Sequence, residues 1–302
     1  MRKTTKLKNL INSPEILVMP GVFDCLSAKI AEKIGFNALQ VTGYGVAASL
    51  LGSPDIGLVT LTEMVNQTKN ICDSVGIPIM ADGDTGFGNA INLIRTVKEF
   101  EKAGAAGINL EDQVFPKRCG HMDGKQIISL DEAVLKIKAA VSAKTDKDFV
   151  INARTDAIAV SGIEEAIKRG NAYAKAGADL IFVEAPEREE DIERVIKAIN
   201  APVSINMTEG GKSPMLTVEK LQKWGAARVS FPVTALFGAY RGIYNILEVL
   251  KEKGTAKHNP ELITTFGEFL SLIDVEDFNK MEREYLPKEI LLDKYKNNEA
   301  LK

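Results

Sequence analysis

Four carboxylates in this sequence stand where they would meet at one site. Asp82 and Asp84 follow one short apolar run, Glu111 follows the next run, and Asp55 lies in an earlier loop. Like charges brought close together repel one another unless a cation neutralises them. Because the set offers only oxygen ligands and no histidine, it favours a hard ion and predicts a Mg²⁺ or Mn²⁺ site. We expect an extended segment at 82–84, which would direct both aspartates to one ion.

The loop after Glu111 carries a cysteine and a histidine among cations, in the order Lys117-Arg118-Cys119-Gly120-His121. Lysine and arginine beside a thiol favour its thiolate, so we expect the pKa of Cys119 to fall toward neutrality, where the thiol can give and take a proton. Glycines in the loop allow it to move. The pattern therefore predicts a mobile lid that carries an acid; the alternative is a solvated basic loop with an incidental cysteine.

The elements that must position these residues are short apolar runs, each followed by a polar corner and a longer segment with helical periodicity. The runs are residues 16–19, 38–42, 77–81, 107–110, 149–152, 180–183, 203–206 and 229–231. Eight alternating βα units in about 250 residues are typical of a TIM barrel. We predict an α/β fold with a (β/α)8 barrel over residues 1–255 and a helical extension over 256–302. A doubly wound sheet is the alternative, but no GxGxxG follows the first run.

Polar residues follow nearly every predicted strand. They are Thr42 to Tyr44, Asp82 to Asp84, Glu111 to Gln113, Arg154 to Asp156, Glu184, and Asn206 with Thr208 and Glu209. The chemistry of a TIM barrel takes place at the carboxyl ends of its strands, so these residues are expected around one mouth.

Composition excludes several classes of function. The chain has 38 basic and 41 acidic residues and a net charge of -3, so it lacks the positive excess that nucleic acid or an anionic bilayer attracts. No apolar stretch approaches the roughly 20 residues that span a bilayer, and the basic N-terminus lacks the apolar run of a signal peptide. Three cysteines make a disulfide framework unlikely for this chain, and Cys25 and Cys72 are interpreted as small core residues. We expect a cytoplasmic protein that binds neither nucleic acid nor membrane.

The motif from Lys117 to His121, together with the segments 82–88 and 111–113, resembles the isocitrate lyase and phosphoenolpyruvate mutase superfamily. The resemblance covers residues from about 20 to 241. It implies a Mg²⁺-dependent TIM barrel that acts on a small carboxylate. It also implies a homotetramer in which the C-terminal helix is exchanged between neighbouring subunits, which would account for the extension.

The resemblance also implies roles for individual residues. Asp55, Asp82, Asp84 and Glu111 would surround the metal, directly or through water. Backbone amides near Thr42, Gly43 and Tyr44 would hold an oxygen of a 2-oxo acid product, and Arg154 would bind its carboxylate. The catalytic group would comprise Cys119 as the acid, His121 and Arg118 in support, and Glu184, which lines the site with Asn206.

Substrate choice within the superfamily depends on the cations of the site. The cysteine loop favours the lyases over the phosphonate mutases, and Phe237 stands where methylisocitrate lyases have an arginine. A tricarboxylate needs one more cationic partner than a dicarboxylate. We therefore predict a lyase that cleaves a 2-hydroxy dicarboxylate, such as 2,3-dimethylmalate, to a 2-oxo acid such as pyruvate and a simple carboxylate such as propionate. The alternatives are a 2-methylisocitrate lyase forming pyruvate and succinate, an oxaloacetate hydrolase, and a phosphonomutase-type enzyme.

Other interpretations of the same residues stay open. Any one carboxylate serves equally well as a helix cap or as the partner of Arg154 or Arg118. A Schiff-base aldolase would need a lysine within a strand, and none of the eight runs contains one. Gly210, Gly211 and Lys212 would suit a phosphate cradle. A barrel retained only as a scaffold would leave the carboxylate cluster without a purpose.

Overall fold

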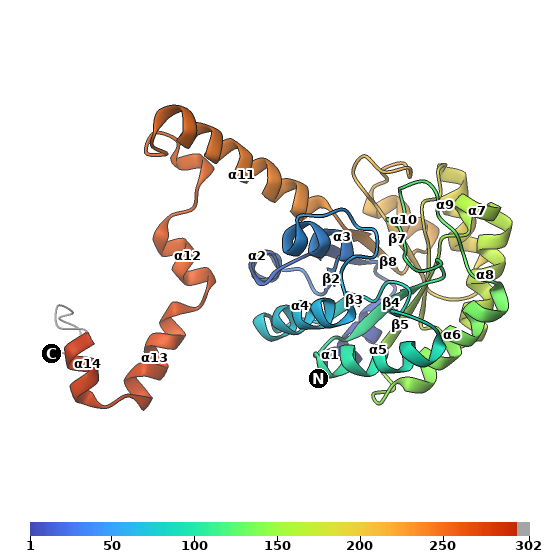
Figure 1. The fold of residues 1–302 in the computed structure, drawn as a ribbon, viewed down its shortest axis with the longest axis horizontal. Coiled ribbons are helices and arrows are strands. Elements are labelled where there is room, and N and C mark those ends of the chain that lie inside the picture. The colour runs from blue at the N-terminus through green and yellow to red at the C-terminus, as the bar shows by residue number, and fades with distance from the viewer. Residues whose placement is uncertain (295–302) are drawn as a thin grey trace. The chain divides into compact units, whose positions relative to one another are not determined.

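Eight parallel strands close into a barrel in which every strand pairs with its neighbours in chain order (Figure 1). The structure is a computed structural model and describes residues 1–294. The strands are β1 Leu17–Val22, β2 Leu39–Val41, β3 Ile79–Asp82, β4 Gly107–Glu111, β5 Val150–Thr155, β6 Leu180–Val183, β7 Val203–Asn206 and β8 Arg228–Phe231. Each predicted run overlaps one of these strands. The predicted (β/α)8 barrel is confirmed.

Helices connect the strands and surround the barrel (Figure 1). They are α2 Cys25–Ile34, α3 Gly43–Val46, the π-helical turn η1 Ala47–Leu51, α4 Leu61–Ser74, α5 Ala90–Lys102, α6 Leu130–Ala143, α7 Ile158–Ser161, α8 Ile163–Lys175, α9 Glu189–Ala198 and α10 Val218–Trp224. Helix α11 Thr234–Lys253 follows the last strand. Asp24, Thr60 and Asn89 begin α2, α4 and α5 with capping boxes, in which two otherwise unpaired backbone N–H groups are satisfied. These capping residues set where the three helices begin, and therefore where the loops between strand and helix end.

The amino end of the barrel is sealed by a helix that sequence reasoning did not predict, α1 Lys3–Ile11. Leu7 and Ile11 are buried in a cluster with Leu17, Val150 and Leu180, each of which begins a strand. Burying a leucine or isoleucine side chain stabilises the fold by about 1.5–3 kcal/mol. The polar strand ends therefore face the other mouth of the barrel.

The chain divides into two compact units, Met1–Ala239 and Tyr240–Lys302. The second unit holds the rest of α11, a 3₁₀ turn η2 Pro260–Leu262, and helices α12 Phe266–Leu272, α13 Val275–Tyr285 and α14 Lys288–Lys294. The sequence placed its boundary at 255/256, after the helix that follows β8, whereas this division falls inside that helix. Across residues 1–294 no helix has the length and apolar content needed to cross a membrane.

Candidate active site

A cavity of about 370 Å³ lies at the carboxyl ends of the strands. Most of the residues singled out from the sequence line it, namely Thr42, Tyr44, Asp55, Asp82, Cys119, His121, Arg154, Glu184 and Asn206. Gly43, Asp84 and Glu111 are buried behind this lining. Arg118 is exposed, and its guanidinium donates to the carbonyl of Asp123 at 3.1 Å. The fold thus brings the predicted group together, with Arg118 turned away from it.

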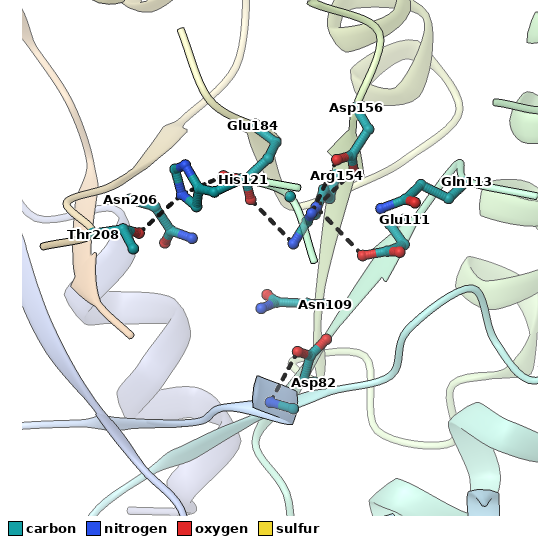
Figure 2. A network of polar contacts seen from close by, with 12 residues as sticks. Asp82, Asn109, Glu111, Gln113, His121, Arg154, Asp156, Glu184, Asn206 and Thr208 are labelled. Atoms are coloured by element: carbon teal, nitrogen blue, oxygen red, sulfur yellow. Dashed lines mark hydrogen bonds and ion pairs between the residues drawn. The ribbon is translucent and has the colours of Figure 1, made fainter. Parts of the chain in front are cut away.

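Arg154 at the end of β5 is held by three carboxylates (Figure 2). Its Nε and Nη2 donate to the two oxygens of Asp156 at 2.8 and 3.0 Å, and its Nη1 lies 3.1 Å from Glu184. Strand register places Glu111 opposite Arg154, and Glu111 Oε2 lies 3.4 Å from Arg154 Nε. The guanidinium carbon lies 5.3 Å from the centroid of the Phe182 ring. Burial would lower the pKa of Arg154, but these carboxylates hold it well above its ordinary value. Arg154 is therefore a fixed cation in the cavity wall.

Asp112 fixes the corner that carries Arg154, a role that sequence reasoning missed. This buried carboxylate accepts from the Thr155 hydroxyl at 2.7 Å, the Asp156 amide at 2.9 Å, Arg169 at 3.0 Å and Tyr173 at 2.7 Å. A carboxylate that accepts from this many donors is strongly oriented. The available signal was its position directly after β4.

Asp156 is the second support that the sequence did not reveal. It pairs with Arg154 and, at 2.9 Å, with the buried ammonium of Lys125. Lys125 belongs to the loop of residues 113–125, which is the predicted lid and is called the lid below. Burial would raise the pKa of Asp156, but Arg154 and Lys125 together lower it to about 2. The lid and the strand end therefore share one carboxylate.

Lys117 from the lid lies between two of the predicted metal ligands. Its ammonium is 2.6 Å from Asp55 and 3.0 Å from Asp84, and it is 3% exposed. Burial raises the pKa of Asp84 to about 6 despite the lysine. The prediction of an extended 82–84 segment is wrong, because Asp84 has a φ of 47°, in the left-handed region, and the chain turns there.

The lid is anchored through its backbone. The Gln113 side chain donates to the Arg118 carbonyl at 2.8 Å and accepts from its amide at 3.0 Å, while the Cys119 amide donates to the Asp55 carbonyl at 3.0 Å. A side-chain amide that binds both backbone groups of one residue mimics a strand neighbour. Cys119 is thereby held at the cavity wall.

The prediction of a near-neutral pKa for Cys119 is wrong. Burial raises the pKa of this thiol above its ordinary value, and the negative charges of Asp55 and Glu184 act in the same direction. The sequence neighbours do not compensate, because Arg118 points to solvent and Lys117 is paired with carboxylates. Cys119 is consequently a neutral thiol at pH 7, which suits a proton donor and not a base.

His121 docks the lid on the loop after β7 (Figure 2). Its Nδ1 accepts from the Lys212 amide at 3.0 Å, which places the proton of the neutral ring on Nε2. Nε2 lies 3.0 Å from Thr208 Oγ1 and 3.2 Å from Glu184 Oε1. Burial lowers the pKa of His121, so the neutral ring is the form expected at pH 7. A Cβ on Gly211 would lie 2.8 Å from Nδ1, so this docking requires glycine there.

The segment after β2 contacts the carboxylate of Asp82. The Gly43 amide donates to Asp82 Oδ2 at 3.1 Å, and a Cβ at Gly43 would lie 2.7 Å from that oxygen. This amide was expected to bind a product oxygen, and here it orients Asp82. Thr42 and Tyr44 face the cavity on either side of it.

The donor set suits a divalent cation. Among the residues that the structure describes, the hydrogen-bond partners of Asp82, which lines the cavity, are backbone amides alone, and the buried Glu111 Oε1 has none. Within residues 1–294, however, no three Asp, Glu, His or Cys side chains are grouped closely enough to hold an ion as they stand. Oxygen donors of this kind fit Mg²⁺ or Mn²⁺, with Asp82 and Glu111 as the carboxylates that Lys117 leaves available.

The fold and the site define a class of protein: a (β/α)8 barrel enzyme whose acidic cavity is covered by a lid that presents a thiol. A model of the phosphoenolpyruvate phosphomutase family matches residues 7–251. The chain belongs to the phosphoenolpyruvate mutase/isocitrate lyase superfamily, as its sequence predicted.

Similar proteins include carbon–carbon lyases. The chain is 44% identical over 285 residues to 2,3-dimethylmalate lyase of Eubacterium barkeri, covering 94% of this chain and 99% of that one. It is 43% identical over 293 residues to 2-methylisocitrate lyase of Aeropyrum pernix, covering 97% and 94%. These relatives agree with the prediction of a carbon–carbon bond lyase.

Solved structures give the same family. Oxaloacetate acetylhydrolase in complex with 3,3-difluorooxalacetate superposes with a TM-score of 0.89 at 37% identity, covering 93% of this chain and 96% of that chain. Phosphonopyruvate hydrolase in complex with oxalate and Mg²⁺ gives a TM-score of 0.87 at 29% identity, covering 95% and 100%. A metal-bound member is thus among the structural neighbours.

Proposed function

We propose that this enzyme cleaves a 2-hydroxy dicarboxylate of the 2,3-dimethylmalate type to a 2-oxo acid such as pyruvate and a simple carboxylate such as propionate. The observation that carries the proposal is the charge of the cavity wall. Among the lining residues, all within the described chain, Arg154 is the one lysine or arginine, and Phe182, Pro232, Val233 and Phe237 give an apolar side. An alkyl-substituted malate fits such a wall, whereas a third carboxylate would be buried without a partner.

Mg²⁺ or Mn²⁺ is part of the proposal. Asp82 would hold the ion, with Glu111 as the second carboxylate and Asp84 and Asp55 around them. A bound divalent ion supplies Lewis-acid polarisation of the substrate's 2-oxygen and its neighbouring carboxylate. The relatives named as lyases and the Mg²⁺ complex among the structural neighbours support this assignment.

The chain's own residues bind the substrate and deliver a proton. Arg154, already oriented by Asp156 and Glu184, would bind the carboxylate next to the reacting carbon. The C2 hydroxyl gives its proton to a general base in the cavity as the C2–C3 bond breaks, and the bonding electrons remain on C3. The neutral thiol of Cys119 then protonates C3. When the lid opens, the base releases its proton to water and the thiolate takes one up, so that both groups return to their starting forms. The closed lid, docked through His121, excludes water until that transfer is complete.

A 2-methylisocitrate lyase is the second candidate. Several similar proteins carry that name, among them the Aeropyrum pernix relative. Lys212, beside the lid, would supply the further cation that a third carboxylate needs if it left Asp123, with which it pairs at 2.7 Å. Oxaloacetate hydrolase and phosphonomutase-type chemistry are further alternatives, because both kinds of enzyme are among the similar proteins.

A substrate panel tests the assignment. The purified full chain with Mg²⁺ is given 2,3-dimethylmalate, 2-methylisocitrate, isocitrate, citramalate and oxaloacetate, and release of 2-oxo acid or oxalate is measured. We expect the highest kcat/KM for dimethylmalate. Preference for methylisocitrate would instead establish the second candidate, and no turnover on the panel would contradict a lyase of malate-like substrates.

The proposal extends to assembly and location. The helices within residues 256–294 would be exchanged between subunits of a homotetramer, and residues 295–302 of the predicted extension lie outside the described residues. Apolar side chains that are 79% (Phe266), 61% (Phe278) and 73% (Tyr285) exposed support this exchange. Light scattering of the full chain should give four times 32.9 kDa. Three free cysteines suit a reducing compartment, and on that ground we place the enzyme in the cytoplasm.

A further inference from the structure

A buried arginine lies in the barrel interior, below the residues that line the cavity, and the proposed reaction gives it no role. Arg228 is the first residue of β8 and is 1% exposed. Its Nη1 donates to Ser204 Oγ at 3.1 Å, and its Nη2 donates to Gln40 Oε1. Its Nε has no hydrogen-bond partner anywhere in residues 1–294. Each hydrogen-bond acceptor of this guanidinium is therefore a neutral group.

Most of the other buried cations of the barrel differ from Arg228 in this respect. Lys117, Lys125, Arg154 and Arg169 each lie within 3.0 Å of a carboxylate oxygen. Lys136 is an exception, because its ammonium donates to the backbone carbonyls of Thr85 and Gly88. Arg228 forms no ion pair with the part of the chain that the structure describes, so its desolvation is not compensated by direct contact. Burial lowers its pKa to about 9, with the charge of Asp82 opposing the shift. Arg228 therefore stays positive at pH 7.

Arg228 also sets the orientation of amides at the floor of the cavity. Gln40 lines the cavity, and with its oxygen bound to Arg228 its nitrogen donates to the Val41 carbonyl at 3.0 Å. With the Asn152 amide turned so that its oxygen accepts from Nη1 at 3.1 Å, its nitrogen donates to the Leu180 carbonyl at 3.2 Å. The Asn109 side chain, which also lines the cavity, lies 2.7 Å from that of Asn152. One cation thus orders the floor amides directly and through a neighbour.

We propose that Arg228 is a positioning residue whose fixed positive charge attracts the anionic ligand of the cavity and orients Gln40 and Asn109 at its floor. The inside of a TIM barrel is usually filled by branched apolar side chains, which would occupy this place without a desolvation cost. A charge retained there acts on groups above it through a medium of low dielectric constant. Asp82, a carboxylate of the site, already interacts with this charge. An anionic ligand brings further negative charge into the cavity, so the charge of Arg228 would stabilise the ligand-bound state as well.

The inference rests on the proposed function only in requiring that the ligand is a carboxylate anion. Because Coulomb energy is proportional to the charge of the ligand, a dianion should lose twice the binding free energy that a monoanion loses when Arg228 becomes neutral. The fold-change for the dianion is then the square of that for the monoanion. A residue that only packed the barrel would weaken both anions equally.

The test is titration calorimetry with oxalate and pyruvate at pH 7 in saturating Mg²⁺, on the full chain. For Arg228→Met we expect the Kd of oxalate to rise about tenfold and that of pyruvate about threefold. Arg228→Lys, which keeps the charge, should retain most of the affinity for oxalate. Thermal unfolding of each variant is measured as well, because Arg228→Met removes the donor to Gln40 and Ser204 and the variant must be shown to fold.

A matched control removes a buried cation elsewhere. Lys144 pairs with Asp179 at 3.0 Å and donates to the Phe149 carbonyl just before β5, at the amino end of the barrel, so Lys144→Met should leave both Kd values unchanged. Arg228→Gln serves if the methionine variant does not fold. Equal losses for the two anions, or unchanged Kd values, would overturn the proposal. The Kd values of oxalate and pyruvate do not depend on which malate the enzyme cleaves. The role of Arg228 can therefore be tested even if the substrate panel contradicts the proposed function.

Discussion

Replacing Cys119 by serine tests the central chemical step. The thiol lines the cavity, and burial raises its pKa above the ordinary value of about 9, so it is almost fully protonated at pH 7. A serine hydroxyl keeps the shape but is a far weaker acid. General acid catalysis contributes about 10²- to 10⁴-fold, so we expect kcat for Cys119→Ser to fall by about that factor, or about 2.7–5.5 kcal/mol in the barrier. KM should change little, because Arg154 and Asp82 are untouched.

The role of Cys119 as an acid also predicts how kcat/KM depends on pH. A group that must be protonated is active below its pKa, so a raised pKa moves the alkaline loss of kcat/KM above pH 9. Steady-state assays from pH 6 to 10 should show a flat rate to about pH 9 in the wild-type chain, and Cys119→Ser should lack the thiol's contribution to the alkaline fall. A serine variant with near wild-type kcat, or a thiol limb below pH 8, would refute the assignment of Cys119 as the acid.

Four further outcomes follow from the site. Asp82→Ala should lose Mg²⁺-dependent turnover while keeping the wild-type melting temperature, checked by activity with and without chelator; full activity would remove Asp82 from the metal site. Gly211→Ala should lower kcat about 10- to 100-fold by displacing the lid histidine, as measured beside Gly267→Ala, whose Cβ meets nothing within 4 Å; equal activity of the two variants would contradict the docking role. Asp112→Asn should reduce the free energy of unfolding by about 3–5 kcal/mol in urea titrations, because it leaves Arg169 buried with less compensation; a loss below 1 kcal/mol would mean that the network relaxes. Phe237→Arg should narrow the preference for dimethylmalate over methylisocitrate at least tenfold in kcat/KM, and an unchanged ratio would show that this position does not select charge.

The barrel could be predicted because each strand has its own local signal. Runs such as 77–81 and 180–183 are apolar throughout, as expected for strands buried on both faces. Capping residues such as Asn89 and Ser129 mark where helices begin. Helix α1 escaped prediction because its buried stripe consists of little more than Leu7 and Ile11 among polar residues. A stripe that short is too weak to recognise as a periodic pattern.

The sequence could predict which residues form the site but not which of them contact one another. Strand-end position alone identified Arg154, Glu184 and Asp82, because parallel strands end at one mouth. Their partners depend on strand register and on how the lid folds back, as with Glu111 opposite Arg154 and Lys117 between Asp55 and Asp84. Neither is encoded in short sequence windows.

The wrong prediction for Cys119 has the same origin. Residues adjacent in sequence were assumed to be adjacent in space, yet in an irregular loop consecutive side chains point in different directions. Arg118 faces solvent while Lys117 is buried among carboxylates. The thiol of Cys119, which follows them in the sequence, therefore experiences burial and negative charge and not the two cations.

Glu184 connects the state of the lid to that of the cavity. One of its oxygens is 3.1 Å from Arg154, and the other is 3.2 Å from the Nε2 of His121. Under the proposed function, a substrate carboxylate that binds Arg154 would compete with Glu184 for the guanidinium, so the carboxylate of Glu184 would become a better acceptor for His121. His121 and Cys119 lie in the same loop, so a stronger contact at His121 would hold Cys119 at the cavity. Binding of the substrate and placement of the acid would then be coupled through the single carboxylate of Glu184.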